Sequence, residues 1–317
     1  FLLVKFKDII NLNAELNHRS IHEIITPSSG GIAIFVSFSL GLFFLDVELP
    51  LHLYLSILFI FLFGLYDDYV GSQLKHKVFV IFILANILFF NDFYIKYLGT
   101  FLGFPIELSG FFAYIFLVFA LVGFVNAVNL IDGLDGLVSV VSIVILSSFL
   151  YLGIKWSDEF LIYMSGIYLA SILGYLYFNW NPAKIFMGDN GSLTLGFVIA
   201  IIAIYAVNKH YISPISTLLL AAVPILDTFL AIIRRLKSGQ SPFDADKEHL
   251  HHVILRSQKN NTRKTVLILG LTQLIFTYIG LGFKIRDDIL ILFLFIMIFI
   301  LIKLLLNQNG NLNELHK

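Results

Sequence analysis

The sequence contains acidic and amide side chains at the ends of its apolar stretches, where oxygen ligands could gather. These residues are Asp67, Asp68, Asn126, Asn129, Asp132, Asp135 and Asp189. Carboxylates collected at a membrane boundary repel each other unless they are paired, hydrated or bound to a metal. Carboxylate and amide oxygens suit Mg²⁺ or Mn²⁺, which retain water and take further ligands from substrate phosphates. The set therefore predicts a divalent-cation site that serves a phosphorylated substrate.

Histidines and a glycine-rich turn add groups that favour phosphate. The polar run Ser-Pro-Phe-Asp-Ala-Asp-Lys-Glu-His-Leu-His-His ends in His249, His251 and His252. Arg256 follows one helical turn later, and together these side chains could bind or polarise a diphosphate. The run Gly-Asp-Asn-Gly-Ser at 188–192 opens an apolar helix, so its backbone N–H groups and the helix dipole suit a phosphate.

Each of these motifs has an ordinary structural alternative. An acidic pair at a helix end is usually solvated, and Asp132-Gly-Leu-Asp-Gly136 could form two turns in which glycine supplies the positive φ. The run at 188–192 could be a simple turn with an N-cap, and the histidines could bind a surface metal or have no role. The basic residues at 234–237 favour an orientation signal over ligands. A shared position of all four motifs on one side of a membrane favours a common site.

The composition indicates a protein whose solvent is the lipid bilayer. Of its 317 residues, 58% are hydrophobic and only 13% are charged, and the mean hydropathy is +0.89. A soluble domain carries about a quarter charged residues, which form its polar surface. The net charge of zero leaves no electrostatic footprint for nucleic acid, so no such partner is expected. The absence of cysteine excludes disulfides, zinc-thiolate sites and cysteine nucleophiles.

Windows of about 20 apolar residues predict an all-α fold, a polytopic bundle of transmembrane helices in one integral-membrane domain over 1–317. Ten complete spans are expected, at 30–46, 51–66, 77–95, 111–128, 134–154, 160–178, 192–208, 212–233, 265–283 and 288–306. The apolar stretch before Lys5 is too short to span, so a truncated N-terminal helix is expected there. The long polar segment 234–264 is expected to be a cytoplasmic loop that carries the His-x-His-His motif.

The distribution of lysine and arginine gives the orientation. Ten spans alternate the loops between two sides, and sixteen of the 21 basic residues then fall on one side, which is expected to be cytoplasmic. All four polar motifs fall on that same side. Because their positions were not used to set the orientation, this clustering independently favours one site at the cytoplasmic face.

The order of these motifs resembles that of the polyprenyl-phosphate N-acetylhexosamine-1-phosphate transferases, a glycosyltransferase family. The matching motifs are Asp-Asp at 67–68, Asn-x-x-Asn-x-x-Asp-Gly-Leu-Asp-Gly at 126–136, Phe-Met-Gly-Asp-x-Gly-Ser at 186–192, and Ser-Pro-Phe-x-x-Asp-x-x-His-Leu-His-His at 241–252. The stretch 223–236 is similar to the branch that initiates O-antigen, enterobacterial common antigen and teichoic acid synthesis, the WecA/TagO type. The muramoyl-pentapeptide branch (MraY) carries three consecutive histidines, whereas Leu250 interrupts them here.

The resemblance implies a reaction, a location and partners. In the family, undecaprenyl phosphate attacks the β-phosphorus of a UDP-N-acetylhexosamine, and UMP leaves. The implied enzyme is a Mg²⁺-dependent (or Mn²⁺-dependent) phosphotransferase of ten or eleven transmembrane helices in the bacterial inner membrane, with a cytoplasmic active site. GlcNAc is the first expectation for the sugar, while GalNAc and 6-deoxy variants stay open. The oligomeric state also stays open, with a homodimer as one alternative.

The resemblance also implies roles for individual residues. Asp189 and Asn129 are the expected metal ligands, and Asp132 and Asp135 are expected to contact metal or nucleotide. Asp67 is expected to handle the proton of the lipid phosphate with support from Asp68, and Lys77 is expected to hold a phosphate. The expected substrate-binding residues are Lys77, Asn126, His249, His251, His252 and Arg256. The family's N-terminal pattern is not matched at Asn17-His-Arg-Ser-Ile-His22, so substrate contacts from that loop are not expected.

Three alternatives remain at this stage. A phospho-MurNAc-pentapeptide transferase would use the same motifs with a different donor. A secondary transporter would place its ionisable residues near the middle of the membrane on broken helices, whereas the interiors of the predicted spans carry almost no charge apart from Asp227. A non-catalytic binder of sugar nucleotide or lipid phosphate would not need acids in every motif.

Overall fold

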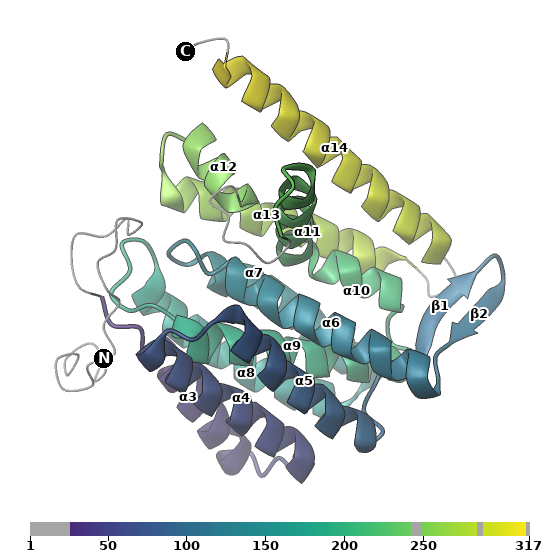
Figure 1. Cartoon of the computed structure of the whole chain (residues 1–317). Helices are drawn as coiled ribbons and strands as arrows, with labels where there is room; N and C mark the ends of the chain where they lie inside the picture. Colours follow the sequence, from purple (N-terminus) through teal and green to yellow (C-terminus); the bar gives the residue numbers. More distant parts are fainter. Residues whose placement is uncertain (1–25, 242–248, 284–287, 315–317) are drawn as a thin grey trace.

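A computed structural model of the chain describes residues 26–241, 249–283 and 288–314, with side chains as far as residue 302 (Figure 1). The helices are α3 (Gly30–Phe44), α4 (Leu51–Val70), α5 (Leu74–Phe90), α6 (Gly110–Leu130), α7 (Leu137–Trp156), α8 (Glu159–Asn179), α9 (Gly188–Asn208), α10 (Pro214–Leu220), α11 (Ala222–Lys237), α12 (Leu250–Ser257), α13 (Thr262–Gly282) and α14 (Asp288–Glu314). The expected truncated helix before Lys5 and the loop at 17–22 lie outside the described residues.

Six of these helices are long and apolar enough to cross a membrane, which identifies a multi-pass helical membrane protein. They are α4, α6, α7, α8, α9 and α13. The pair α10–α11 would be a seventh span if counted as one, and α3 and the first part of α14 (Asp288–Ile302) are shorter apolar helices. The expected count of ten spans therefore stays a prediction. The segment 234–264, expected to be a loop, contains the end of α11, all of α12 and the start of α13.

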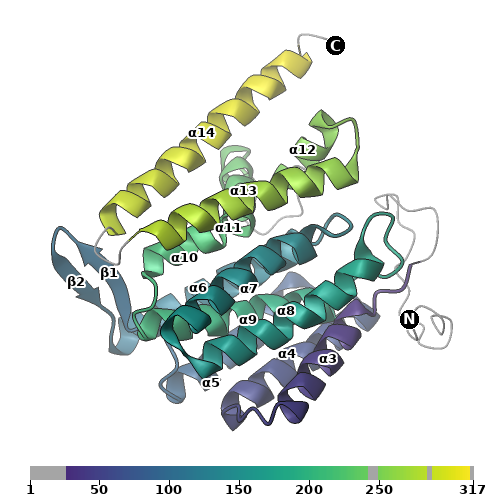
Figure 2. The same cartoon turned by 180° about the vertical axis from the view of Figure 1, so that it is seen from behind.

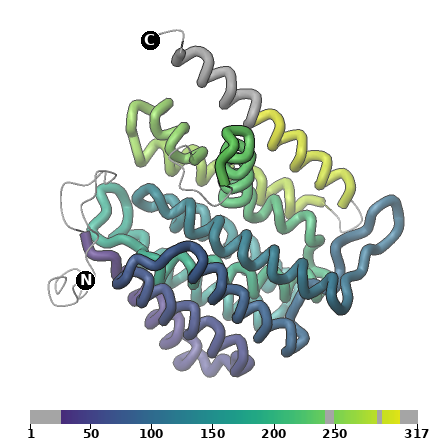
Figure 3. The backbone as a smooth tube through the Cα atoms, in the orientation of Figure 1, coloured from purple at the N-terminus to yellow at the C-terminus, as the bar shows by residue number. Residues whose placement is uncertain are grey.

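Two features differ from the expected fold. The chain is not wholly helical, because β1 (Tyr97–Phe101) and β2 (Phe104–Glu107) form an antiparallel hairpin that projects from one end of the bundle (Figure 3). The expected span 212–233 is not one straight helix, because α10 and α11 meet at an angle of 89°. Apolar content predicts membrane burial, but it carries no information about a bend, which depends on neighbouring helices that can bind the freed backbone groups.

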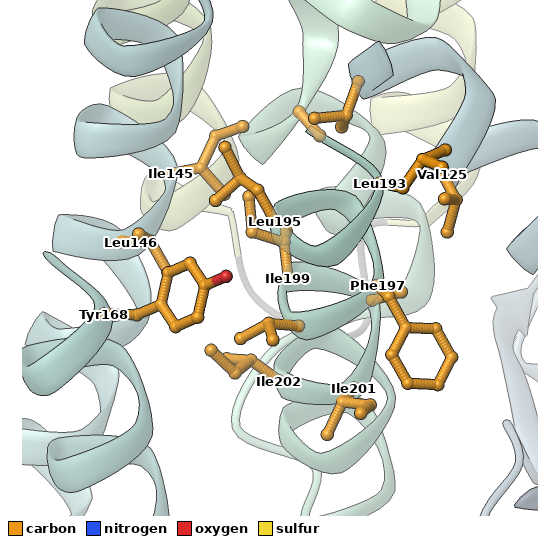
Figure 4. Close-up of a cluster of buried hydrophobic side chains, with 14 of the residues drawn as sticks. Val125, Ile145, Leu146, Tyr168, Leu193, Leu195, Phe197, Ile199, Ile201 and Ile202 are labelled. Atoms are coloured by element: carbon orange, nitrogen blue, oxygen red, sulfur yellow. The ribbon is translucent and has the colours of Figure 1, made fainter. Parts of the chain in front are cut away.

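Helix α9 lies at the centre of the bundle. It is buried along most of its length, and it packs against α3, α4, α6, α7 and α8. Figure 4 shows Phe197 of α9 on the side of Val125 from α6, while Ile199 faces Leu146 and Tyr168 from α7 and α8. Figure 2 shows α3 and α4 on one side of this core and α13 and α14 on the other. The amino end of α9, where Asp189 lies, is thereby fixed among the ends of several other helices.

Close approach of α4 to α9 depends on a glycine. A Cβ added at Gly64 would lie 2.7 Å from the backbone nitrogen of Asn190, so only glycine allows this contact. Small residues at such contacts let transmembrane helices pack backbone to backbone. Because Gly64 lies one turn before Asp67 and Asp68, this contact carries both acids to the amino end of α9. Helix α4 then ends at Gly71, whose positive φ of 67° suits glycine.

The bend between α10 and α11 is stabilised by one buried side chain, Gln273 of α13. Its amide nitrogen donates to the carbonyl oxygens of Leu219 and Leu220 at 3.2 and 2.9 Å, and its oxygen accepts from the backbone N–H of Val223 at 3.0 Å. A broken helix inside a membrane must have its freed backbone groups satisfied by such partners. Gln273 therefore stabilises the bend that sets the direction of α11.

Replacing Gln273 with leucine should lower the free energy of unfolding by about 2 kcal/mol, because buried backbone groups of the bend lose their partners. Thermal unfolding of the purified protein in detergent measures the loss. The matched control is Gln240→Leu, because Gln240 is exposed beyond the end of α11. Equal melting temperatures for the two variants would contradict the role of Gln273.

Candidate active site

A cavity of about 470 Å³ lies among the ends of several helices. These helix ends lie at the end of the bundle opposite the β1–β2 hairpin (Figure 1). Helices α4 and α6 end beside the cavity, α9 begins beside it, and the turn at 131–136 forms part of its wall. Six of the residues expected from the sequence line it, namely Asp68, Asn129, Asp132, Asp135, Asp189 and His252. The fold therefore brings together acids that are separated by more than a hundred positions along the chain.

Lys77 links two of the predicted acids. Its Nζ lies 2.7 Å from a carboxylate oxygen of Asp67 and 2.6 Å from one of Asp189. The other oxygen of Asp67 accepts a hydrogen bond from the backbone N–H of Ser72 at 2.8 Å. Asp67 is buried at this contact, and neither it nor Lys77 lines the cavity. The geometry of Asp67 therefore favours positioning Lys77 over direct contact with a substrate.

Replacing Lys77 with methionine should lower the free energy of unfolding by about 3 kcal/mol, because Asp67 would remain buried without its cation. The neighbouring substitution Lys75→Met is a suitable control, since Lys75 is exposed on the same helical turn. Thermal unfolding of both variants in the same detergent compares them. If Lys77→Met has the same melting temperature as Lys75→Met, the buried ion pair does not contribute to stability as described.

Asp68 caps the amino end of α9. One of its oxygens accepts from the backbone N–H of Asp189 at 2.7 Å, and the other accepts from the N–H of Asn190 at 3.0 Å and from the Asn190 side chain. These are two of the backbone N–H groups that the turn at 188–192 was expected to offer to a phosphate. The free-phosphate-cradle hypothesis is therefore wrong for these two groups, because a carboxylate of the same chain already binds them. The carboxylate also satisfies the positive end of the helix dipole.

Asn129 and Asp189, the two expected metal ligands, are in direct contact. The amide nitrogen of Asn129 donates to Asp189 Oδ1 at 2.6 Å and to the hydroxyl of Ser192 at 2.8 Å. Asp189 Oδ2 binds Lys77, so both oxygens of this acid already have one partner. The Asp189 side chain keeps about 30% of its surface exposed, and it faces the cavity. It remains accessible to a further ligand.

Asp132 and Asp135 lie on the same turn but have different surroundings. Asp135 is buried, and one of its oxygens accepts from the side chain of Asn181 at 2.9 Å and from the backbone N–H of Ala183 at 3.0 Å. Among the residues that the structure describes, none hydrogen-bonds to the carboxylate of Asp132. Burial raises the pKa of Asp132 well above its ordinary value of 3.8, and the nearby charges of Asp189, Asp68 and Asp135 raise it further.

The histidine motif is divided between two environments. His252 lines the cavity, and burial lowers its pKa to about 4, with His251 and His249 adding to the effect, so this ring is neutral at pH 7. His249 and His251 are buried instead, and Nδ1 of each ring lies 3.1 and 3.2 Å from the same oxygen of Asp227. Neither of these two rings lines the cavity. The expectation of three equivalent phosphate contacts is therefore not matched by the geometry.

Two expected substrate-binding residues do not line the cavity. The amide nitrogen of Asn126 donates to the backbone oxygen of Val122 in its own helix at 2.7 Å. Arg256 lies in the last turn of α12, outside the cavity wall. Spacings of three and four residues put Asn126 and Arg256 on the same helix faces as Asn129 and His252, but one turn away along each helix, where they do not line the cavity.

Several cavity residues were not expected from the sequence. They are Ser28, Asn179, Asn181 and Thr262. Asn179 is buried and accepts from the backbone N–H of Gly136 at 2.9 Å, while Asn181 holds Asp135, so both amides fix the acidic turn. The signal that could have found them is two amides close together at a membrane boundary, since buried polar groups there need partners. Asp227 carried a similar signal as an ionisable residue in an apolar stretch.

Comparisons with known proteins agree with this arrangement. The sequence model of glycosyl transferase family 4 matches residues 50–207, which contain α4 to α9. A probable undecaprenyl-phosphate N-acetylglucosaminyl 1-phosphate transferase of Bacillus subtilis (strain 168) is 31% identical over 278 residues, which cover 84% of this chain and 76% of that protein. The chain belongs to glycosyl transferase family 4. The acids on α4, on the turn at 131–136 and at the start of α9 all lie within the matched range.

Two further relatives are named for the same activity. The undecaprenyl-phosphate alpha-N-acetylglucosaminyl 1-phosphate transferases of Yersinia pestis and Escherichia coli (strain K12) are each 30% identical to this chain. Both matches cover 84% of this chain and 76% of the relative. These matches extend beyond the range of the family model. Membership of the family identifies the chain as a transferase.

Proposed function

We propose that this chain transfers N-acetylglucosamine 1-phosphate from UDP-N-acetylglucosamine to undecaprenyl phosphate and releases UMP, as the first membrane step of a cell-surface polysaccharide. The observation that carries the proposal is the cavity in which Asp132, Asp189 and Asn129 converge at one end of a transmembrane bundle. The names of the relatives supply the lipid acceptor and the sugar phosphate that is transferred. A cavity of about 470 Å³ is within the usual range for small-molecule sites.

The bond changes are those of a phosphoryl transfer. An oxygen of the lipid phosphate forms a bond to the β-phosphorus of the donor, and the bond from that phosphorus to the bridging oxygen of UMP breaks. The lipid phosphate needs no obligatory base, because the second pKa of a phosphate monoester is about 6 and the group is mostly dianionic at neutral pH. Catalysis then depends on bringing two anions together and on neutralising their charge.

The residues of the cavity fit a divalent cation, and Mg²⁺ or Mn²⁺ is proposed. The acids and amides of the cavity offer oxygen ligands, the carboxylate of Asp132 has no hydrogen bond from the described residues, and Asp189 is exposed to the cavity. Asp189 and Asn129 would hold the ion, with Asp132 beside them. The ion would neutralise charge on the donor diphosphate. Asp135 would orient the turn through Asn181.

Cationic and neutral donors of the chain would complete the site. Lys77 holds Asp189 in place, and its ammonium is the positive charge nearest to that acid. His252 is neutral at pH 7 because of its lowered pKa, so it would donate a hydrogen bond to a phosphate oxygen without adding charge. Asp68 caps the amino end of α9 by accepting a hydrogen bond from the backbone N–H of Asp189, and this fixes the position of Asp189.

The location of the site suits a lipid substrate. The cavity lies where helices end, which would set it at the depth of a lipid head group while the undecaprenyl chain remained in the bilayer. We propose ten spans, made of the six long helices, the bent pair α10–α11, and the shorter helices α3, α5 and α14. The excess of lysine and arginine then assigns the cavity to the cytoplasmic face of a bacterial inner membrane.

The direct test uses purified full-length protein in detergent with undecaprenyl phosphate, Mg²⁺ and one radiolabelled UDP-sugar at a time. UDP-N-acetylglucosamine should give butanol-extractable label and an equal amount of UMP. UDP-N-acetylgalactosamine and UDP-MurNAc-pentapeptide are the parallel donors, and a clear preference for either would assign a different sugar. No product with any donor would defeat the proposed function.

A further inference from the structure

Asp227 of α11 is a buried acid that the proposed reaction does not use. It is about 1% exposed, and one oxygen accepts from Nδ1 of both His249 and His251 at 3.1 and 3.2 Å. The other oxygen accepts from the backbone N–H of Leu250. One carboxylate thus binds three consecutive residues at the start of α12. A buried carboxylate with three such donors is well compensated, which accounts for its presence in an apolar stretch.

The bend between α10 and α11 places Asp227 next to His249 and His251. Helix α11 begins after the 89° bend that Gln273 stabilises, and it packs against α6, α12 and α13. A straight continuation of α10 would carry Asp227 elsewhere, so the bend and the histidine contact belong to one arrangement. The position of α12 therefore depends on a side chain that comes from the broken helix.

The hydrogen bonds to Asp227 also select the state of each ring. An anionic carboxylate only accepts, so Nδ1 of both rings must carry a proton, and the second nitrogen, Nε2, is left available. Among the described residues, none hydrogen-bonds to Nε2 of either ring. In His251 this atom is directed at the acidic turn, since a Cβ added at Gly133 would lie 2.6 Å from it. Gly133 itself lines the cavity.

We propose that Asp227 is a positioning residue that holds His249 and His251 with Nδ1 protonated, so that Nε2 of His251 supports the part of the cavity that receives the donor diphosphate. The inference rests on the proposed function for the identity of the donor. The ring of His251 also contacts that of His252 in a tilted arrangement, with centroids 4.3 Å apart, and His252 lines the cavity. Asp227 thus acts on the donor through the histidines and touches no substrate itself.

The first test measures donor and acceptor separately in Asp227→Asn. The amide keeps the size of the side chain but loses its negative charge, and its NH₂ group can only donate. That group must face either the two imidazole N–H groups or the backbone N–H of Leu250, so the common anchor of the rings is weakened. Calorimetric titration of the full-length variant with UDP-N-acetylglucosamine should give a dissociation constant about tenfold higher than for the unmodified chain, as expected for loss of a charged hydrogen bond. The KM for undecaprenyl phosphate should stay within about twofold.

The matched control is Asp92→Asn at the other end of the bundle. The side chain of Asp92 is 71% exposed and pairs with Lys96, and its positive φ of 58° suits asparagine. This variant should leave both constants unchanged. Equal weakening of donor and acceptor in Asp227→Asn, or an unchanged donor constant, would overturn the proposal.

A spectroscopic test is independent of transfer. Nitrogen-15 spectra of histidine-labelled protein should give protonated Nδ1 signals for two rings, which His249→Asn and His251→Asn assign by their loss. These signals should move in Asp227→Asn and stay in Asp92→Asn. A stoichiometric transition metal in the purified protein would overturn the assignment, because Asp227, His249 and His251 lie close enough to share an ion and Nδ1 would then be a ligand.

A second variant covers a loss of folding in Asp227→Asn. His251→Asn retains an amide N–H near the position of Nδ1 for Asp227 but removes Nε2, so it should fold and still weaken donor binding about tenfold. Donor binding at the unmodified level in folded His251→Asn would overturn the proposal. If the unmodified protein binds the donor but transfers nothing, the proposed function fails while the role of Asp227 is still decided by the binding constants.

Discussion

Replacing Asp189 with asparagine is expected to reduce the rate of sugar-phosphate transfer by about 1000-fold while the protein remains folded. The acid lies at the amino end of the central helix, its oxygens bind Lys77 and Asn129 at 2.6 Å, and it faces the cavity. Asparagine keeps these dimensions and removes the charge. Loss of one preorganised electrostatic group at a phosphoryl-transfer site has an effect of this order.

The measurement is kcat with saturating donor and lipid, together with the Mg²⁺ concentration that gives half-maximal activity. Chelation with EDTA should abolish transfer by the unmodified chain, and added Mg²⁺ should restore it, whereas Asp189→Asn should need a much higher concentration of the ion. Asp92→Asn controls for the loss of one negative charge. A variant that keeps more than a tenth of the normal rate would remove Asp189 from the metal assignment.

Replacing Asp132 with asparagine is expected to have opposite effects on activity and stability. Transfer should fall about 100-fold, because the cavity loses a carboxylate that is free to interact with the metal or nucleotide. The melting temperature should rise by about 2 °C or more at pH 7, because a carboxylate held among Asp189, Asp68 and Asp135 without a hydrogen bond from the described residues is costly to ionise. Such exchange of stability for function is common at active sites.

The expected gain in stability of Asp132→Asn depends on pH in a definite direction. Folding raises the pKa of Asp132 above 3.8, so the folded chain binds that proton more tightly than the unfolded chain does. The stability linked to this proton is full below the unfolded pKa and is lost as the pH rises through the folded pKa. The advantage of Asp132→Asn should therefore be small at about pH 4 and grow toward pH 8, in melting curves recorded without divalent ions.

Asp135→Asn provides the internal contrast. This acid accepts hydrogen bonds from Asn181 and Ala183, so its replacement should lower the melting temperature at neutral pH, although it lies on the same turn. A loss of stability in Asp132→Asn like that in Asp135→Asn would mean that Asp132 has partners in the folded state. A gain in both would contradict the assigned hydrogen bonds.

Much of the fold follows from composition and hydropathy. Long apolar windows predicted α4, α6, α7, α8, α9 and α13, because a helix in lipid must satisfy its own backbone and expose apolar side chains. The same argument could not find the bend at 220–223. That bend depends on Gln273, fifty residues further along the chain, and a hydropathy window does not include such a partner. The β1–β2 hairpin lies outside the apolar core, where the same constraint does not apply.

The site was predictable to a similar extent. Asp132, Asp135, Asp189 and Asn129 are acids and amides whose types indicated a metal and whose topology assigned them to one side, and all four line the cavity. Their partners were not predictable. The pairing of Lys77 with both Asp67 and Asp189 joins helices that are adjacent only after folding. The contacts of Asp227 likewise join α11 to α12.

The sequence by itself determined that this protein lies in a lipid bilayer and is built of helices. It also determined the family to which the motifs correspond and the set of groups that could hold phosphate and metal. These properties depend on residue types and short spacings, which the chain carries before it folds. Only the tertiary structure decided which of those groups face the cavity and which hold others in place. The acids Asp68 and Asp189 are of one type, yet one closes the end of α9 and the other remains open to a ligand. That difference arises because hydrogen-bond partners come from distant helices, and their distance and direction exist only in the packed bundle.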